Sequence, residues 1–262
     1  NMFKERARAK TLLSVFLLVS SAGPGLAQNA SWPDLSMPAS AGGGGERDAA
    51  VVIGAEKYAF VEHVIGAKQN ALDWQAYLTE TRKVPAEHVA LLLDNDAVAD
   101  QIRQAASEKA AQVGPGGTLW FIFIGHGAPS KDGKDGLLIG IDAPQKAERL
   151  QSRSLARGEL LGVLAKGQQA QTVVVLDACF SGKAPSGQAL VAGLQPLVAL
   201  QAHPQGVDER VVLMTAARSD QFAGPLPGGR RPAFSYLALG AMRGWAADAQ
   251  GAVTASGVID YA

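Results

Sequence analysis

The chain has 262 residues, of which 47% are hydrophobic and 18% are charged, the balance of an ordinary globular protein. Lys and Arg together number 24, as do Asp and Glu, so the formal net charge is zero. The chain has neither a basic excess nor a basic stripe interleaved with aromatic residues. The sequence therefore gives no support to binding of nucleic acid or of an anionic membrane surface.

The first 27 residues have the pattern of an export signal. Basic residues between positions 4 and 10 precede an apolar core at 12–19, and Gly25-Leu26-Ala27 places small residues where a signal peptidase reads them. We predict cleavage after Ala27 and a periplasmic or secreted protein. An uncleaved anchor is the alternative, but this core is far shorter than the ~20 residues of a spanning helix, so we expect no stable membrane span.

Residues 28–49 are rich in Gly and Pro and offer little that could form a core. They predict a flexible linker between the signal peptide and a domain of residues 50–262.

Within that domain, apolar runs alternate with segments of helical period. The runs predict strands at 50–53, 89–93, 118–124, 172–176 and 211–214. Helical spacing occurs at 67–78, 98–105, 155–164 and 234–245, with Ser154 as N-cap of the third helix and a small hairpin at 137–139. Continuous apolar strands separated by helices predict an α/β fold with a mostly parallel sheet covered by helices on both faces.

Two polar motifs follow two of these strands: Gly125-His126-Gly127 and Asp177-Ala178-Cys179. Ligands of open parallel sheets bind beyond the carboxyl ends of the strands, where both motifs lie. Cys179 is the single cysteine, so no intrachain disulfide can form. A thiol becomes a good nucleophile when an imidazole accepts its proton, whereas a cysteine considered alone is more often an inert buried side chain.

The combination predicts that His126 is a general base and Cys179 a nucleophile. The backbone N–H groups of Gly127 and Cys179 are the candidate oxyanion hole.

The two motifs, in this order, resemble the caspase-like superfamily and most closely the bacterial metacaspase-type (orthocaspase) cysteine proteases. The resemblance runs from about Val51 to Ala262 and includes residues 53–58, 66–71, 125–127, 177–182, 215–221 and 234–236. It implies a caspase-like peptidase domain that hydrolyses peptide bonds of protein or peptide substrates through an acyl-enzyme, without a cofactor.

The resemblance also implies a pocket for a basic side chain. Asp177 stands where metacaspases have a pocket carboxylate, and Asn70 stands where they commonly have a second one. Cleavage after Arg or Lys is therefore expected. The loop after His126 keeps only Asp132 and Asp135 beside two lysines, which is too few oxygens for calcium, so we predict a solvated loop and no metal site.

Two other functions stay open. The first is a catalytically inactive caspase-like scaffold or adaptor, although such modules often lack the Cys or the His. The second is another Cys-dependent acyl hydrolase, although no Gly-x-Ser-x-Gly elbow surrounds Cys179. The resemblance further predicts self-cleavage between Gly182 and Val211, with Arg230 and Arg231 as second candidate sites.

Overall fold

The structure is a computed structural model that describes residues 34–35, 42–184, 187–190, 208–216, 225–226 and 230–262. The predicted signal peptide and most of the predicted self-cleavage segment lie outside these ranges. Within them, no helix has both the length and the apolar character that a membrane span requires.

Five parallel strands form the central sheet in the order β2-β1-β3-β7-β8. Their bounds are β1 (Ala49–Gly54), β2 (Val89–Leu93), β3 (Thr118–Ile124), β7 (Gln171–Asp177) and β8 (Val211–Thr215). Strands β1, β3 and β7 are buried along almost their whole length, because helices cover both faces of the sheet. The predicted strands are confirmed to within about one residue at each end.

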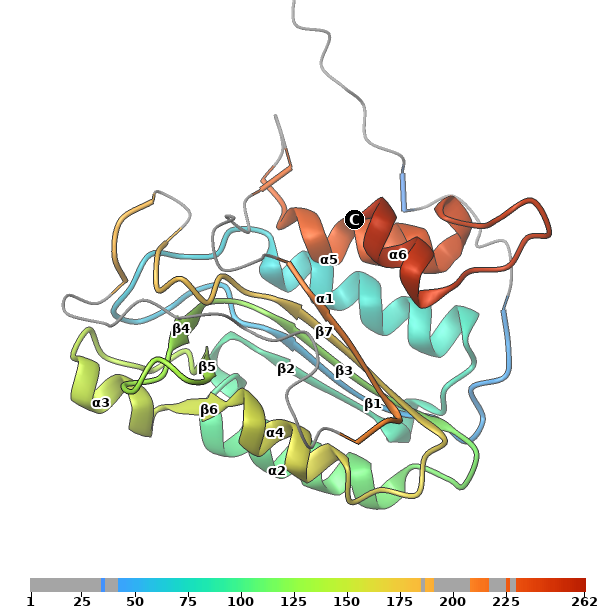
Figure 1. The fold of residues 1–262 in the computed structure, drawn as a ribbon, viewed down its shortest axis with the longest axis horizontal. Helices are drawn as coiled ribbons and strands as arrows, with labels where there is room; N and C mark the ends of the chain where they lie inside the picture. Colours follow the sequence, from blue (N-terminus) through green and yellow to red (C-terminus); the bar gives the residue numbers. More distant parts are fainter. Residues whose placement is uncertain (1–33, 36–41, 185–186, 191–207, 217–224, 227–229) are drawn as a thin grey trace, which may run out of the picture. The chain divides into compact units, whose positions relative to one another are not determined.

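Helices cover the two faces of this sheet (Figure 1). One face carries α1 (Ala67–Ala76) and α5 (Ala233–Gly240), with α6 (Ala255–Tyr261) against α5, and the other carries α2 (Ala99–Gln112) and α4 (Arg157–Leu164). Trp74 of α1 and Ile102 of α2 are fully buried against the strands. The predicted α/β architecture is confirmed.

Short helical turns join these elements. They are η1 (Tyr77–Thr81), η2 (Ala86–His88), η3 (Asp94–Asp96), α3 (Ala147–Ser152) and η4 (Ala241–Trp245).

A second, antiparallel sheet follows directly from the end of β3. It consists of β4 (Gly127–Pro129), β5 (Gly136–Ile139) and β6 (Ser154–Ala156), and it confirms the hairpin expected at 137–139. The predicted N-cap role of Ser154 is wrong. Its hydroxyl donates to the Leu150 carbonyl at 2.7 Å, and α4 begins only at Arg157, with Ala156 as its N-cap residue.

The last residues of the predicted linker belong to the domain. Asp48 is buried, and its carboxylate accepts hydrogen bonds from the Thr118 N–H at 2.8 Å and the Trp120 indole N–H at 3.0 Å. Its second oxygen also pairs with Arg82 at 3.1 Å. A buried carboxylate with all these partners ties Asp48 to the sheet, so this residue packs with the domain.

Candidate active site

The carboxyl ends of β3 and β7 bring the two predicted motifs to one edge of the sheet. Ile124 pairs with Asp177, and the Gly125 N–H donates to the Asp177 carbonyl at 3.1 Å. His126 and Cys179 each follow this pair by two residues on adjacent strands. The prediction that the two motifs end neighbouring strands is therefore confirmed.

The His126 imidazole is buried and held by a backbone carbonyl. Its Nε2 lies 2.6 Å from the carbonyl oxygen of Glu62, in the loop between β1 and α1. A carbonyl can only accept, so this contact requires the proton on Nε2 and leaves Nδ1 as the basic nitrogen. Burial lowers the pKa of His126 below its ordinary value, and the Glu62 carbonyl opposes this shift. The ring is therefore neutral at pH 7 and able to accept a proton.

Tyr58 fixes the backbone of His126. Its hydroxyl accepts from the His126 N–H at 2.8 Å and donates to the Ile139 carbonyl of β5 at 3.1 Å. Its ring centre lies 4.7 Å from that of the imidazole. Burial raises the pKa of Tyr58, so the phenol keeps the proton that this bridge uses.

Gly127 lies directly against the nucleophile segment. A Cβ at this position would come within 3.2 Å of the Cys179 carbonyl oxygen and 3.0 Å of the Phe180 ring. Gly127 is paired with Leu138 of β5, and the Ile139 N–H of that strand donates to the His126 carbonyl. The pair of Gly127 and Leu138 is therefore one that exchanges no hydrogen bonds. Its own N–H therefore points away from β5.

Cys179 sits in a sharp turn with its thiol almost buried. The side chain is 9% exposed, and its Sγ lies 2.8 Å from the hydroxyl oxygen of Ser181. Gly182 then has φ +71°, a left-handed conformation that glycine adopts without strain. Ser181 is thus placed to donate a hydrogen bond to the sulfur when it is ionised.

The two predicted substrate-binding residues meet through the first turn of α5. Asp177 is buried, and its Oδ2 accepts from the Ser235 N–H at 2.7 Å. Asn70 of α1 donates from Nδ2 to the Ser235 hydroxyl at 2.7 Å and to the Pro232 carbonyl at 2.9 Å. Its Oδ1 accepts from Arg231 at 2.6 Å. Asn70 is thus fully engaged by the chain itself.

Burial raises the pKa of Asp177 from 3.8 to about 6, against the hydrogen bonds from Ser235. No cation among the described residues forms an ion pair with this carboxylate. Within the described ranges, Asp177 is therefore a buried acid whose negative charge is stabilised by neutral donors.

Most of the chain matches a known protein family. The family described as Caspase domain matches residues 47–230, more than half of the chain. The chain belongs to the caspase-domain family. This membership makes it a relative of cysteine peptidases and disfavours the inactive scaffold.

Two solved structures are distant likenesses of this caspase-domain chain. Caspase-1 from Spodoptera frugiperda is 12% identical, with 76% of this chain and 69% of that chain covered and a TM-score of 0.46. Protein GSU0716 from Geobacter sulfurreducens is 19% identical over 50% of each chain, with a TM-score of 0.41, so the match spans half its length. A search of the curated proteins gives no match. The family assignment rests on the domain match alone.

The acidic loop after His126 is occupied by its own contacts. Asp132 accepts from the Ser130 hydroxyl at 2.6 Å, which lowers the pKa of Asp132. Asp135 pairs with the buried guanidinium of Arg157 at 3.3 Å and accepts from the Gly158 N–H at 2.8 Å. The expectation of a merely solvated Asp135 is wrong, because this carboxylate ties the loop to α4. Across the described ranges, no group of three or more His, Cys, Asp or Glu side chains could hold a metal ion.

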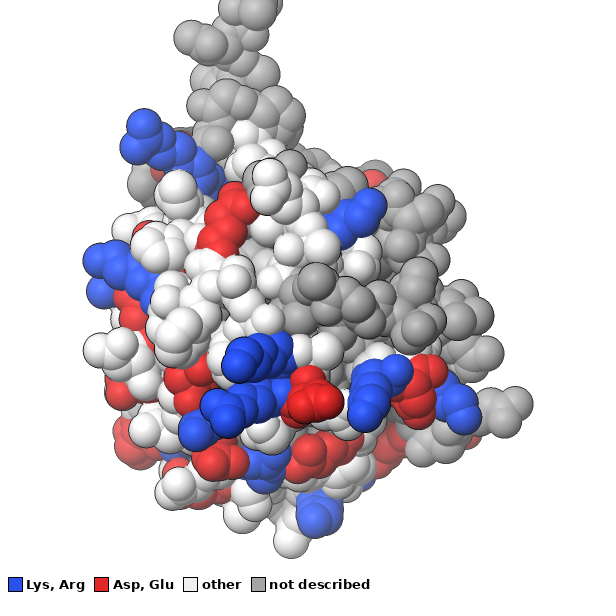
Figure 2. Space-filling model, turned by 90° about the vertical axis from the view of Figure 1, so that its left-hand side faces the viewer, with Lys and Arg blue, Asp and Glu red and all other residues white. Residues whose placement is uncertain are grey.

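The surface around the carboxyl ends of the strands carries both signs of charge. Figure 2 shows that Lys and Arg are interspersed with Asp and Glu over its lower part, while much of the described surface above is uncharged. Selection of a charged substrate at this edge would therefore depend on buried groups rather than on a field of one sign.

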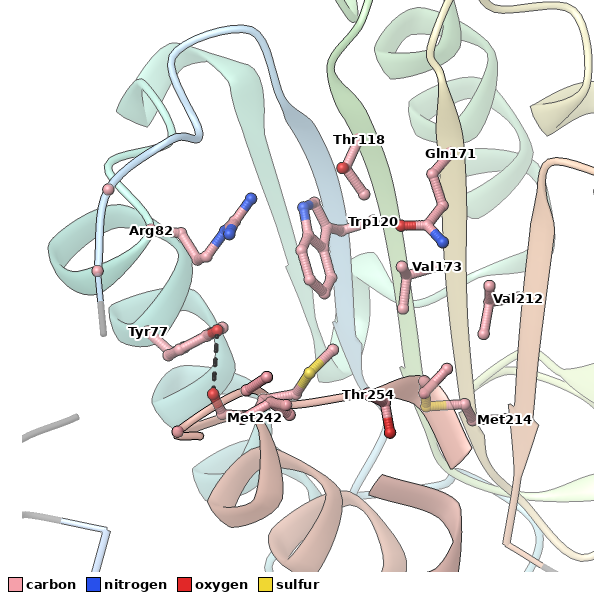
Figure 3. Close-up of a pocket in the computed structure, with 16 residues that line it drawn as sticks. Tyr77, Arg82, Thr118, Trp120, Gln171, Val173, Val212, Met214, Met242 and Thr254 are labelled. Carbon is pink, nitrogen blue, oxygen red and sulfur yellow. Dashed lines mark hydrogen bonds between the residues drawn. The ribbon is translucent and has the colours of Figure 1, made fainter. Parts of the chain in front are cut away.

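A cavity of about 520 Å³ lies at the other end of the same strands (Figure 3). Trp120, Val173 and Met214 line it from β3, β7 and β8, and Tyr77 and Arg82 close one side. These strand residues precede the carboxyl ends from which the His126 and Cys179 motifs emerge. The cavity is thus separate from the His126–Cys179 edge.

Proposed function

We propose that this caspase-domain protein is a cysteine endopeptidase of the metacaspase type that cuts after Arg or Lys with a His126–Cys179 dyad. One observation carries the proposal: the two residues leave neighbouring strands, and the imidazole is oriented by the Glu62 carbonyl through Nε2. This arrangement leaves Nδ1 unprotonated, and a general base needs an unprotonated nitrogen that can accept a proton.

In the proposed reaction, His126 Nδ1 takes the proton of the Cys179 thiol as the sulfur attacks the carbonyl carbon of the scissile peptide. The Ser181 hydroxyl, 2.8 Å from Sγ, stabilises the thiolate. The imidazolium then gives its proton to the leaving amine, and a thioester remains on Cys179. His126 next takes a proton from water as this water attacks the thioester, and the imidazolium returns the proton to the departing Cys179 sulfur when the product acid is released.

The oxyanion formed in both steps needs donors beside Cys179. Gly127 is suited to this role because its N–H points away from β5 and its Cα lies against the Cys179 backbone. We assign the Gly127 and Cys179 N–H groups to the oxyanion. A side chain at position 127 would crowd the Cys179 carbonyl and the Phe180 ring, so glycine suits this position.

Asp177 supports the preference for basic residues. It lies two residues before the nucleophile on β7, is buried, and has no cationic partner among the described side chains. A carboxylate left in this state is costly, and the guanidinium or ammonium group of a substrate would supply the missing positive charge. An acidic substrate side chain would add a second negative charge and be excluded.

The direct test uses fluorogenic peptides that differ only in the residue before the reporter, Arg, Lys or Asp. Wild type should cleave the Arg and Lys peptides and leave the Asp peptide intact. Cys179→Ala and His126→Ala should each lose about 10⁴-fold or more in kcat/KM. His63→Ala, which removes an exposed histidine near the site, is the matched control and should keep full activity. A much smaller loss in purified Cys179→Ala would overturn the dyad, and cleavage after Asp would overturn the specificity.

We further propose export after cleavage behind Ala27, on the basis of the basic, apolar and small-residue pattern of residues 1–27. Amino-terminal sequencing of the protein recovered from a secreting host should begin at Gln28. Recovery of the intact leader in the cytoplasm would contradict this assignment.

A further inference from the structure

Arg231, just before α5, is bound by side chains of α1 and α5. Its Nε donates to Asn70 Oδ1 at 2.6 Å, and its Nη2 pairs with the carboxylate of Asp73. Its guanidinium carbon lies 4.8 Å from the centre of the Tyr236 ring. An acceptor amide, a carboxylate and an aromatic face are the groups by which proteins recognise guanidinium. Asn70, Asp73 and Tyr236 thus form a guanidinium site that holds Arg231.

This site is joined to Asp177 by a single residue. Asn70 Nδ2 donates to the Ser235 hydroxyl, and the Ser235 N–H donates to Asp177 Oδ2, both at 2.7 Å. In the part of the chain that the structure describes, Arg231 is the one cation in ion-pairing contact with this network. Among the described side chains, one positive charge thus stands against two carboxylates: Arg231 pairs with Asp73 and reaches Asp177 only through Asn70 and Ser235.

We propose that Arg231 occupies, in cis, the place that the basic side chain of a substrate takes, and that Asp73 supplies the second carboxylate that Asn70 lacks. The inference rests on the proposed preference for Arg or Lys. A basic substrate side chain would then meet two carboxylates, Asp73 and Asp177, rather than Asp177 alone. Arg231 is thus a built-in competitor that weakens the binding of every basic substrate by the same factor.

The contacts allow both retention and release of Arg231. Its side chain is 27% exposed and that of Asp73 is 26% exposed, and ion pairs so open to water contribute little to stability. The backbone is held more firmly. The Arg231 carbonyl accepts from the Leu226 N–H at 2.9 Å, and the Pro232 carbonyl accepts from Asn70. The side chain can therefore leave the site while its backbone stays in place.

The test measures binding without catalysis, in full-length chains that carry Cys179→Ala. N-acetyl-arginine amide is titrated by calorimetry into this parent and into the parent with Arg231→Ala. We expect binding about tenfold tighter to the second chain, the factor that follows if Arg231 fills the site about nine-tenths of the time. Adding Asp73→Asn should remove this gain. N-acetyl-norleucine amide, which has no cation, should bind no better to any variant.

Arg230→Ala is the matched control, because Arg230 is the exposed neighbour of Arg231 on the same segment. Equal affinities of the Arg231→Ala and Arg230→Ala chains for the arginine amide would overturn the inference. If Arg231→Ala lowers the unfolding midpoint, Arg231→Gln keeps a donor for Asn70 and should give the same ranking. If Arg231→Ala tightens amide binding but the protein with Cys179 intact cuts no peptide, the guanidinium site is supported and the proposed peptidase is refuted. If that protein cuts after Arg but the Arg231→Ala and Arg230→Ala chains bind the amide equally, only the inference about Arg231 is refuted.

Discussion

The two ends of the parallel sheet bury different chemistry. At the amino end, Trp120 and Met214 line a cavity of about 520 Å³, and the buried Asp48 is neutralised by Arg82. At the carboxyl end, the buried Asp177 has neutral donors from Ser235 and no ion pair among the described residues. Both ends contain a buried carboxylate, but among the described side chains only the one at the amino end is matched by a cation.

This contrast shows why cavity volume alone is a poor guide to the site in this fold. At the amino end, the buried Asp48 carboxylate is already paired with Arg82, so this end is stable as it stands. A buried acid with pKa raised to about 6 and a buried histidine with lowered pKa are held away from their ordinary ionisation. Such groups mark the places where a protein retains unfavourable electrostatics for chemistry or binding.

Among variants that leave His126 and Cys179 in place, the largest effect is expected from Asp177→Asn at the carboxyl end. Asn can still accept from the Ser235 N–H but supplies no charge, so kcat/KM for Arg peptides should fall about a hundredfold. The fall should appear mainly in KM, since His126 and Cys179 are untouched. Steady-state kinetics on paired Arg and norleucine peptides measures this. An equal loss for both peptides would assign Asp177 a structural role only.

The same variant should become more stable than wild type as the pH rises. In the folded wild type, the pKa of Asp177 is raised from 3.8 to about 6, so the folded state binds more protons than the unfolded state between these values. Wild type therefore loses stability as pH rises from about 4 to 7, and an asparagine does not titrate. Urea unfolding at pH 4 and pH 7 should show the Asp177→Asn advantage growing with pH. A constant difference would contradict the raised pKa.

A smaller loss of activity is expected from Tyr58→Phe. The change removes the hydroxyl that joins the His126 N–H to the Ile139 carbonyl, so kcat should fall about tenfold as the imidazole loses its fixed position. Stability should fall by about 1–3 kcal/mol, because two buried polar groups lose their partner. Tyr77→Phe makes the same change at the amino end, where the hydroxyl donates to Met242 at 3.5 Å. It should leave kcat unchanged, and an equal fall in both variants would contradict the contrast.

Trp120→Phe should affect stability alone. It removes the indole N–H that donates to Asp48 at 3.0 Å and the ring that lies 5.5 Å from the Arg82 guanidinium. The unfolding free energy should fall by about 1–2 kcal/mol, whereas kcat/KM should stay within about twofold of wild type. Thermal unfolding and peptide kinetics on one preparation give both values. A large loss of activity at full stability would show that the amino end communicates with the dyad.

The sequence predicted the strands well because their burial on both faces leaves continuous apolar runs. It also placed His126 and Cys179 at neighbouring strand ends, since glycine and polar residues interrupt those runs. The N-cap prediction for Ser154 was wrong because a serine before an apolar helical segment looks the same in the sequence whether or not it caps the helix. Its hydroxyl instead donates to the Leu150 carbonyl of α3.

No sequence pattern indicates the roles of the remaining site residues. The Glu62 contact uses a backbone carbonyl, which any residue could supply, so its side chain says nothing about the role. Tyr58 was part of the family resemblance, but its bridge depends on the pairing of β4 with β5. The contact of Arg231 with Asp73 joins residues far apart in the chain. Only the packing of α5 beside α1 brings them together.

The smallest effect is expected from removal of divalent metal. Asp135 already pairs with Arg157, whose side chain is only 6% exposed, and Asp132 is held by the Ser130 hydroxyl. A calcium ion needs six to eight oxygens, and drawing Asp135 to it would break the ion pair that Asp135 makes with the buried Arg157 guanidinium. Peptidase activity should therefore stay within about twofold of its starting value during an EDTA titration and a calcium add-back. Asp135→Ala should still lower thermal stability, through Arg157, at any calcium concentration. If EDTA abolished activity and calcium alone restored it, this loop would be a metal site after all.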